Sequence, residues 1–365
     1  MKKVLIVVGT RPNFIKITQF PRVLGSHADK FDFKIIHTGQ HFDDVMSKVF
    51  FQQFGFLPDV FLKADAAPHG NPITGIRMGL EKIFAEHKPD LVMVVGDVNS
   101  TAAGALAAKK LNIKVAHVES GLRSFDQSMP EELNRILTDN ITDYFFVTEQ
   151  SGIDNLIREG KDPKRIFFVG NTMIDTMVAF GSEIDALNVL EKLNIHANKY
   201  VLITMHRPAT VDSPEGLNKL INVIDSIAGK YKIVFPIHPR TVKNLKEFGL
   251  FEKISDIKNL ILSEPLDYFS FQKLIKNSRL IITDSGGIQE ESTFLGVPCL
   301  TLRPNTERPV TVELGTNELL PFDLNVIKGR ILAINQGKFK KGSIPPLWDG
   351  HATERIMEII SRLLA

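Results

Sequence analysis

The stretch from His117 to Arg135 brings together histidine, arginine and carboxylate side chains directly after an apolar run. A charge packed against a buried strand costs several kcal/mol unless it is paired or used. Glu119 and Glu131 lie in this stretch, and Asp97 follows an earlier apolar run. If these three acids crowd at the edge of one sheet, their repulsion separates their proton affinities and provides one acid and one base. The alternatives are that the stretch 117–135 is a solvated surface loop, and that Asp97 only satisfies neighbouring backbone amides.

A second group of residues has the composition of an anion site. The segment Gly9 to Lys16 follows the first apolar run, and its glycine permits a sharp turn into a helix that starts near Pro12. Free amides at such a helix start bind anions, and Arg11 and Lys16 add positive charge. The segment can equally be a strand-to-helix turn with two surface cations. It lacks the glycine fingerprint of dinucleotide folds, so a nicotinamide cofactor is not indicated.

The segment Thr283 to Glu291 is a stronger phosphate candidate. Ser285, Gly286 and Gly287 are small enough for backbone amides to approach a phosphate closely at a helix start. Glu291 can accept hydrogen bonds from ribose hydroxyls. The alternative is a capped helix whose acids only complement its dipole.

Two histidines also follow apolar runs. His206 precedes Arg207, and His238 precedes Pro239. A histidine such as His206 can donate a proton to a leaving phosphate, although a lone histidine is usually a structural residue. No His or Cys pairs occur at metal-ligand spacing, so no metal site is predicted.

The elements that must position these residues are parallel strands covered by helices. Short apolar runs alternate with amphipathic segments such as Pro214 to Lys230, which is typical of doubly wound α/β domains. The predicted strands are Lys3–Val8, Phe33–His37, Leu91–Val95, Lys114–Val118, Tyr144–Val147, Ile166–Val169, Tyr200–Thr204, Lys232–Pro236, Asn259–Ser263, Arg279–Thr283 and Pro298–Leu302.

Each polar motif follows one of these runs at its C-terminal end, where such folds bind ligands. The expected architecture is two Rossmann-like α/β domains that face a cleft. We place the first at residues 1–170 and the second, which binds nucleotide, at 171–350, with a closing helix at 351–365 that can pack back on the first domain.

Composition sets limits on partners. The 365 residues are 43% hydrophobic and 24% charged, with a net charge of +2, so neither nucleic acid nor a membrane is an expected partner. No run reaches the roughly 18 apolar residues of a membrane span. The single cysteine, Cys299, lies in an apolar run and is interpreted as a core residue, which favours a cytoplasmic protein.

In their order and spacing, these motifs resemble the non-hydrolysing UDP-N-acetylglucosamine 2-epimerases over residues 4 to about 320. The matching pieces are Gly9-Thr10-Arg11-Pro12 with Lys16, Thr38-Gly39-Gln40-His41, Gly96-Asp97, the block His117–Arg135, Gly170-Asn171, His206-Arg207, His238-Pro239, Asp284–Glu291 and Thr306-Glu307-Arg308-Pro309.

The resemblance implies a glycosyltransferase-B-like fold, a homodimer, no cofactor, and UDP held mainly by the second domain. Matching positions assign the diphosphate to Ser285, Gly286 and Gly287, and the ribose to Glu291. The resemblance assigns uracil binding to the segment 264–271, through Phe271 and the backbone of Leu266. Arg308, Arg11 and Lys16 are assigned to the phosphate side or the nucleotide, and catalysis to Asp97, Glu119, Glu131 and His206.

Family chemistry begins with loss of UDP, because no carbonyl acidifies the C2 proton. The C1–O bond breaks with loss of that proton and leaves a 2-acetamidoglucal, and UDP then adds back with protonation on the other face. We predict that Asp97 or Glu131 moves the C2 proton. Glu119 stabilises charge at C1 or orders its neighbours, and His206 assists the leaving phosphate.

The chain departs from many relatives at Asn13, at Pro208-Ala209-Thr210 and at Phe42-Asp43-Asp44. Some bacterial members bind a second UDP-N-acetylglucosamine as an activator through the last two regions, so we hypothesise that this chain lacks or has altered that site. The alternative functions are epimerisation of UDP-2,3-diacetamido-glucuronate, glycosyl transfer, and non-catalytic binding of a nucleotide sugar.

Overall fold

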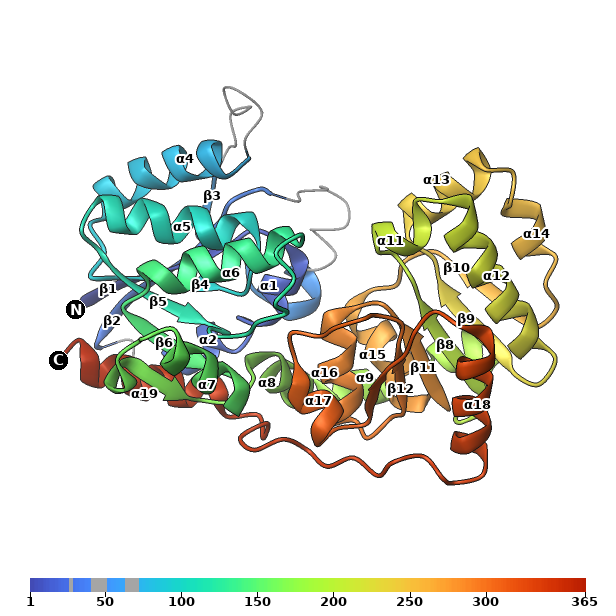
Figure 1. The fold of residues 1–365 in the computed structure, drawn as a ribbon. Helices are drawn as coiled ribbons and strands as arrows, with labels where there is room; N and C mark the ends of the chain where they lie inside the picture. Colours follow the sequence, from blue (N-terminus) through green and yellow to red (C-terminus); the bar gives the residue numbers. More distant parts are fainter. Residues whose placement is uncertain (26–28, 41–50, 63–71) are drawn as a thin grey trace. The chain divides into compact units, whose positions relative to one another are not determined.

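The computed structural model describes residues 1–25, 29–40, 51–62 and 72–365. The chain divides into two compact units (Figure 1). Unit 1 comprises residues 1–179 and 346–365, and unit 2 comprises residues 180–345. Each unit is built on one parallel sheet, which confirms the predicted fold class of two doubly wound α/β domains.

In the described part of unit 1, seven parallel strands are ordered β3-β2-β1-β4-β5-β6-β7. Helices α4 and α5 cover one face of the sheet, and their side chains form a core with β1, β4 and β5 (Figure 1). The strands are β1 Lys2–Val8, β2 Phe31–His37, β3 Val60–Phe61, β4 Leu91–Val95, β5 Lys114–Val118, β6 Tyr144–Val147 and β7 Ile166–Phe168. The helices are α1 Arg11–Ile15, α2 Phe20–Gly25, α4 Pro72–His87, α5 Asn99–Lys110, α6 Pro130–Ile141, α7 Gln150–Arg158, the 3-10 turn η1 Pro163–Arg165, α8 Thr172–Ala179 and α19 Ala352–Leu363.

In unit 2, six parallel strands are ordered β10-β9-β8-β11-β12-β13. Helices α12, α13, α14 and α18 pack on one face, and α10, α15 and α16 on the other. The strands are β8 Tyr200–Thr204, β9 Lys232–Pro236, β10 Leu260–Ser263, β11 Leu280–Thr283, β12 Cys299–Thr301 and β13 Asn317–Leu319. The helices are α9 Gly181–Ala186, α10 Val189–Lys192, α11 Pro208–Val211, α12 Pro214–Ala228, α13 Pro239–Glu247, α14 Phe251–Ser255, α15 Tyr268–Asn277, α16 Gly286–Phe294, α17 Pro309–Glu313 and α18 Leu324–Asn335.

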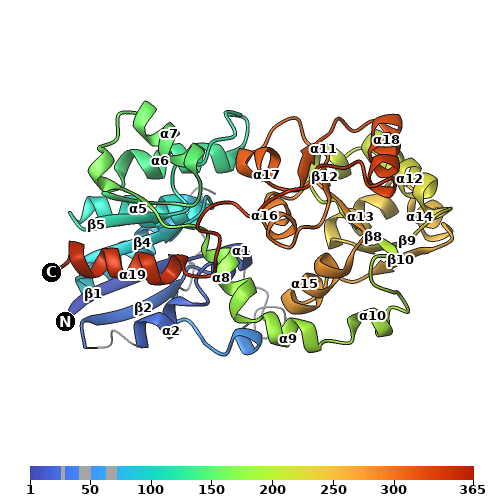
Figure 2. The same ribbon diagram turned by 90° about the horizontal axis from the view of Figure 1, so that it is seen from below.

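The division between the units lies after residue 179, later than we placed it, because α8 packs on unit 1. The Thr176 hydroxyl donates to the carbonyl of Ile15 and bonds the hydroxyl of Thr18. Asp175 accepts hydrogen bonds from the first amides of α19, Ala352 and Thr353. The last helix thus lies on unit 1, in contact with α2 and α8 (Figure 2), and the chain already belongs to unit 1 from residue 346.

Both sheets have a point at which the winding reverses. In unit 1 it falls between β1 and β4, and in unit 2 between β8 and β11. Ligands of doubly wound folds bind at the carboxyl ends of the strands at such a point. The motif residues that follow β1, β4, β8 and β11 are therefore placed where a ligand is expected.

Candidate functional site

In unit 1 the predicted acids Asp97 and Glu119 follow the neighbouring strands β4 and β5. Glu119 is 3% exposed and forms an ion pair with Lys16 from the end of α1. Asp97 is partly exposed and forms an ion pair with Arg135 of α6. We expected repulsion among the acids to separate their proton affinities, but each of these two has a cationic partner. It also places Lys16 against Glu119, where we had expected it to face a phosphate.

Glu119 has an unusual backbone. Its φ is +70°, a region that L-residues with a side chain rarely occupy, at a cost of about 1 kcal/mol. The conformation is held because the amides of Glu119 and Ser120 both donate to the carbonyl of Phe146, at 3.0 and 3.1 Å. Strain of this kind is typical of functional sites. The turn aims the carboxylate at Lys16.

The third predicted acid, Glu131, lies in the first turn of α6 and is exposed. Its neighbour Glu132 is 1% exposed and accepts hydrogen bonds from the amides of Ser124 and Phe125. Glu132 also pairs with Arg135 at 2.9 Å. Of the two adjacent glutamates, Glu132 therefore shapes the loop before α6, and Glu131 is accessible to a ligand.

The remaining predicted cation, Arg11, begins α1 and is half-buried. Asn13, one of the departures from the family pattern, is buried: it accepts from the hydroxyl of Thr10 and donates to the carbonyl of Val95. Gln40 accepts from the amide and hydroxyl of Ser100. His41, the last residue of that motif, and the departure at 42–44 lie outside the described residues.

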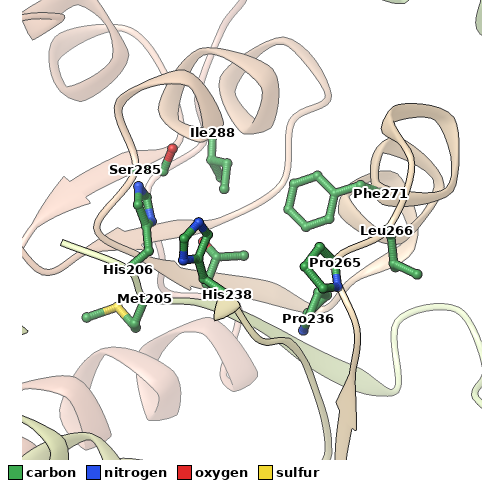
Figure 3. Close-up of a pocket in the computed structure, with 10 residues that line it drawn as sticks. Met205, His206, Pro236, His238, Pro265, Leu266, Phe271, Ser285 and Ile288 are labelled. Atoms are coloured by element: carbon green, nitrogen blue, oxygen red, sulfur yellow. The ribbon is translucent and has the colours of Figure 1, made fainter. Parts of the chain in front are cut away.

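In unit 2 a pocket of about 240 Å³ lies at the reversal point of the sheet (Figure 3). Four predicted site residues line it: His206, Leu266, Phe271 and Ser285. In Figure 3 the ring of Phe271 faces the cavity, whereas the side chain of Leu266 points away from the histidines. Gly286 and Gly287 begin α16 directly after Ser285, so the free amides of the helix start lie beside the pocket.

Asp284, to which we gave no role, anchors His206. Its carboxylate accepts from the amides of His206 and Arg207, and lies 3.0 Å from Nδ1 of the His206 ring. Because the carboxylate accepts at Nδ1, Nε2 is the ring atom that can exchange a proton with a ligand. The His206 side chain is 45% exposed, so a bound ligand can reach it.

His238 lines the same pocket, and the centroid of its ring lies 6.3 Å from that of the His206 ring. Burial lowers its pKa, and the charges of His206 and Arg240 lower the pKa further. The Arg240 amide donates to Nδ1 at 3.1 Å. His238 is thus a neutral ring at pH 7, with Nε2–H available as a donor.

The predicted ribose acid Glu291, on α16, is 5% exposed and is not among the residues that line the pocket. Burial raises its pKa to about 8, with a further contribution from the charge of Glu290. Glu291 is therefore largely protonated at pH 7, and its carboxyl group can donate as well as accept. Arg308 pairs with Glu290 at 2.6 Å and with Glu307 at 2.5 Å, so this predicted phosphate ligand is also the ion-pair partner of two buried acids.

Several functional partners escaped the sequence analysis, chiefly those on the buried face of α6. Glu132, Arg135 and Asp139 are spaced by three and four residues and so share one helix face. Charged residues at this spacing, on a helix that covers a sheet, were the available signal. Within the described residues, no group of three His, Cys, Asp or Glu side chains could hold a metal ion.

The family model for UDP-N-acetylglucosamine 2-epimerases matches residues 25–361. The chain belongs to this family. It is 42% identical to the UDP-N-acetylglucosamine 2-epimerase of Methanocaldococcus jannaschii, over 98% of this chain and 99% of the relative. It is 36% identical to the UDP-2,3-diacetamido-2,3-dideoxy-D-glucuronate 2-epimerase of Pseudomonas aeruginosa, over 99% of this chain and all of the relative.

A crystal structure of the Methanocaldococcus jannaschii UDP-GlcNAc 2-epimerase, in complex with UDP-GlcNAc and UDP, matches 99% of both chains with a TM-score of 0.88. The fold is therefore glycosyltransferase-B-like, as the family resemblance implied. Among the described residues, no helix has the length and apolar character needed to cross a bilayer.

Proposed function

We propose that this protein is a non-hydrolysing 2-epimerase that interconverts UDP-N-acetylglucosamine and UDP-N-acetylmannosamine for the synthesis of surface polysaccharide precursors. Family membership supports the reaction class. The observation that carries the proposal is the division of chemistry between the units: carboxylates that can move a proton gather at the reversal point of unit 1, and a pocket with a helix start lies at that of unit 2.

UDP binding is assigned to unit 2. The diphosphate is held by the amides of Ser285, Gly286 and Gly287 at the start of α16, where the helix dipole favours negative charge. Glu291 and the segment around Leu266 and Phe271 hold ribose and uracil. Arg308 and Arg11 are assigned to the phosphate side as cations, whereas Lys16 acts through its ion pair with Glu119.

Elimination and re-addition follow from the acids. The electron pair of the C1–O bond leaves with UDP, and Nε2 of His206 gives its proton to the leaving phosphate oxygen. Asp97 or Glu131 takes the C2 proton, and that C–H electron pair forms the C1=C2 double bond. In the re-addition step UDP adds at C1, and a carboxylic acid protonates C2 from the other face, which gives the epimer. Glu119, fixed by Lys16, stabilises positive charge at C1.

Isotope exchange tests the proposal. Incubation with UDP-N-acetylglucosamine in D2O should give the manno epimer with deuterium at C2, without accumulation of free UDP. The anomeric NMR signal of the epimer reports its formation. Two variants, Asp97→Asn and Glu131→Gln, identify the acid that moves the proton: replacing that acid should slow deuterium exchange at C2 about 100-fold or more. Asp90→Asn, an acid that bonds the Lys3 amide elsewhere in unit 1, is the control. Free UDP with no epimer, or no isotope uptake at all, would contradict the proposal.

A second substrate calls for a direct assay because one relative is named for UDP-2,3-diacetamido-glucuronate. The C6 carboxylate of that sugar requires a cation. Lys16, Arg123 and Arg135 are each paired with an acid of unit 1, which favours the neutral sugar. Isotope uptake with the glucuronate alone would reverse this assignment.

Two further properties are proposed with it. Leu133 and Leu137 are 53% and 37% exposed on one face of α6, which supports a homodimer that light scattering would detect.

A cytoplasmic location fits the single cysteine of the chain, because Cys299 is fully buried and has no second cysteine with which to form a disulfide.

We also propose that the activator site of some bacterial relatives is missing or altered, because residues 208–210 form α11 with a different sequence. Kinetics with the manno substrate should then be hyperbolic. Sigmoidal kinetics relieved by a trace of the gluco sugar would refute this.

A further inference from the structure

His117 lies on β5, fully buried, between two oxygen atoms. Its Nδ1 is 2.7 Å from a carboxylate oxygen of Asp139, and its Nε2 is 2.8 Å from the carbonyl oxygen of Gly96. Neither proton transfer nor substrate binding, as proposed above, uses this ring. Its two contacts nevertheless join the buried face of α6 to the turn that carries Asp97.

Both partners of the ring are acceptors. A backbone carbonyl has no proton to give. The other oxygen of Asp139 accepts from the Gly121 amide at 3.1 Å and pairs with Arg123 at 2.8 Å. Asp139 is therefore a carboxylate, because its second oxygen meets a backbone donor and a permanent cation. Since neither the Gly96 carbonyl nor Asp139 has a proton to give, both nitrogens of His117 must carry one.

A charged imidazole is tolerated here because the surrounding charges balance. Asp139 neutralises His117 from one side, and Arg123 continues the network to Glu159 with hydrogen bonds of 2.8 and 2.7 Å. Two cations therefore face two carboxylates. Glu159 is 32% exposed, so the network reaches solvent only at its far end. Buried ions persist when they are paired and hydrogen-bonded in this way.

The group that His117 holds is the peptide immediately before Asp97. The Gly96 amide donates to the Val118 carbonyl at 3.0 Å, and the Gly96 carbonyl accepts from His117, so β5 fixes Gly96 at both ends. The Asn134 side chain donates to the carbonyl of Asp97 at 3.0 Å. The direction of the Asp97 side chain depends on this turn.

We infer that His117 is a positioning residue: as a buried imidazolium paired with Asp139, it holds the Gly96 carbonyl and thereby sets Asp97 for the reaction. The link to turnover rests on the proposed function. A neutral ring that donated to Asp139 would turn the lone pair of Nε2 toward the Gly96 carbonyl. The two would repel, and the turn would shift.

Nitrogen NMR of histidine-labelled protein tests the charge without any substrate. At pH 7.5 the His117 ring, assigned by its absence in His117→Gln, should show both nitrogens protonated. Asp139→Asn keeps the size of the side chain but removes the charge. Its amide oxygen keeps the contacts to Gly121 and Arg123, so its NH2 group faces Nδ1, and the ring should become neutral with only Nε2 protonated. His117→Met, which has no donor for the Gly96 carbonyl, should shift the Gly96 amide signal. Asp143→Asn is the control, since Asp143 is also buried, pairs with Lys109 and accepts from the Val115 amide of β5.

Kinetics test the positioning. His117→Met, which leaves the Gly96 carbonyl without its donor, should lower kcat about 100-fold, the size expected for a displaced reactive group, with KM changed less than about threefold. Asp143→Asn should keep kcat within about twofold. His117→Gln, which retains an amide donor, should keep more activity than the similarly sized His117→Met.

The outcomes separate the claims. An unprotonated nitrogen on His117 in the wild-type protein overturns the imidazolium, even if the variants fail to fold. An unshifted Gly96 amide signal or an unchanged kcat in His117→Met overturns the positioning role, and a ring that stays doubly protonated in Asp139→Asn overturns the pairing with Asp139. If the wild-type protein epimerises no UDP-sugar, the proposed function fails, while the ring and Gly96 signals still decide the inference.

Discussion

Gly96 and Gly249 form a natural pair for separating backbone strain from site geometry, because both have φ of +66°. A Cβ at Gly96 would lie 2.9 Å from Nδ2 of Asn13 and 3.3 Å from Nζ of Lys16, whereas one at Gly249 meets nothing within 4 Å. Both alanine variants should lose about 1 kcal/mol of unfolding free energy. Only Gly96→Ala should also lower kcat, by about tenfold or more, because it displaces Lys16 and the turn before Asp97. Equal activities in steady-state assays would show that the contacts of Gly96 do not matter.

Glu291 makes stability depend on pH. Its folded-state pKa of about 8 lies above the ordinary 4.5, so between these values the native protein holds a proton that the unfolded chain has released. The stability is fully present below about 4.5 and is lost as pH rises through 8. The side chain of Glu291→Gln cannot titrate. Urea unfolding should therefore show that, between about pH 5 and pH 8, the unfolding free energy of the wild type falls by a few kcal/mol relative to that of the variant.

The exposed Glu252 on α14 supplies the control for that titration, and Glu252→Gln should follow the wild-type curve. Parallel pH curves for wild type and Glu291→Gln would mean that Glu291 is ionised in the native protein at neutral pH.

The sequence predicts which residues lie at the strand ends but not which partners they have there. Asp97, Glu119, His206 and Ser285 follow apolar runs, and parallel strands bring such positions to one edge. The pairing of Asp97 with Arg135 depends instead on which face of α6 meets the sheet. That face is set by packing between elements distant in the sequence, and no local pattern encodes it.

The same distinction separates predicted from missed elements. Leu91–Val95, Lys114–Val118 and Tyr200–Thr204 were predicted with their observed bounds, because central parallel strands are continuous apolar runs. The edge strands β3 and β13 were missed, since one has two residues and the other reads Asn-Glu-Leu. Edge strands are held by a single neighbour and need little apolar character.

Asp175 joins α8 to the last helix, α19. Its carboxylate accepts from the amides of Ala352 and Thr353 and from the Thr353 hydroxyl, which caps a helix start. Asp175→Ala should cost about 1–2 kcal/mol and speed hydrogen exchange throughout α19. Asp323→Ala removes a comparable cap from α18 in unit 2, and should leave α19 protected. Unchanged exchange in α19 after Asp175→Ala would show that apolar packing alone docks it.

The chain passes between the units twice, after residue 179 and after residue 345, and each unit has its own core. Neither unit alone contains all the groups that the proposed reaction needs. In the proposed reaction, acids of unit 1 move the proton at C2, and the histidine and the helix start of unit 2 bind the leaving UDP. The proposal therefore requires that a single sugar nucleotide contact residues of both units.

Hydrogen exchange with two ligands tests this requirement. UDP alone should slow exchange in unit 2, at residues 205–208 and at the start of α16, because phosphate binds free helix amides. UDP-N-acetylglucosamine should slow exchange at those amides and also at residues 96–99 and 119–125 of unit 1, since only the sugar reaches the acids. Glu131→Gln, chosen to slow turnover, keeps the sugar nucleotide intact during the measurement. If both ligands protect the same amides, the acids of unit 1 do not engage the sugar, and the division of chemistry proposed for this enzyme is wrong.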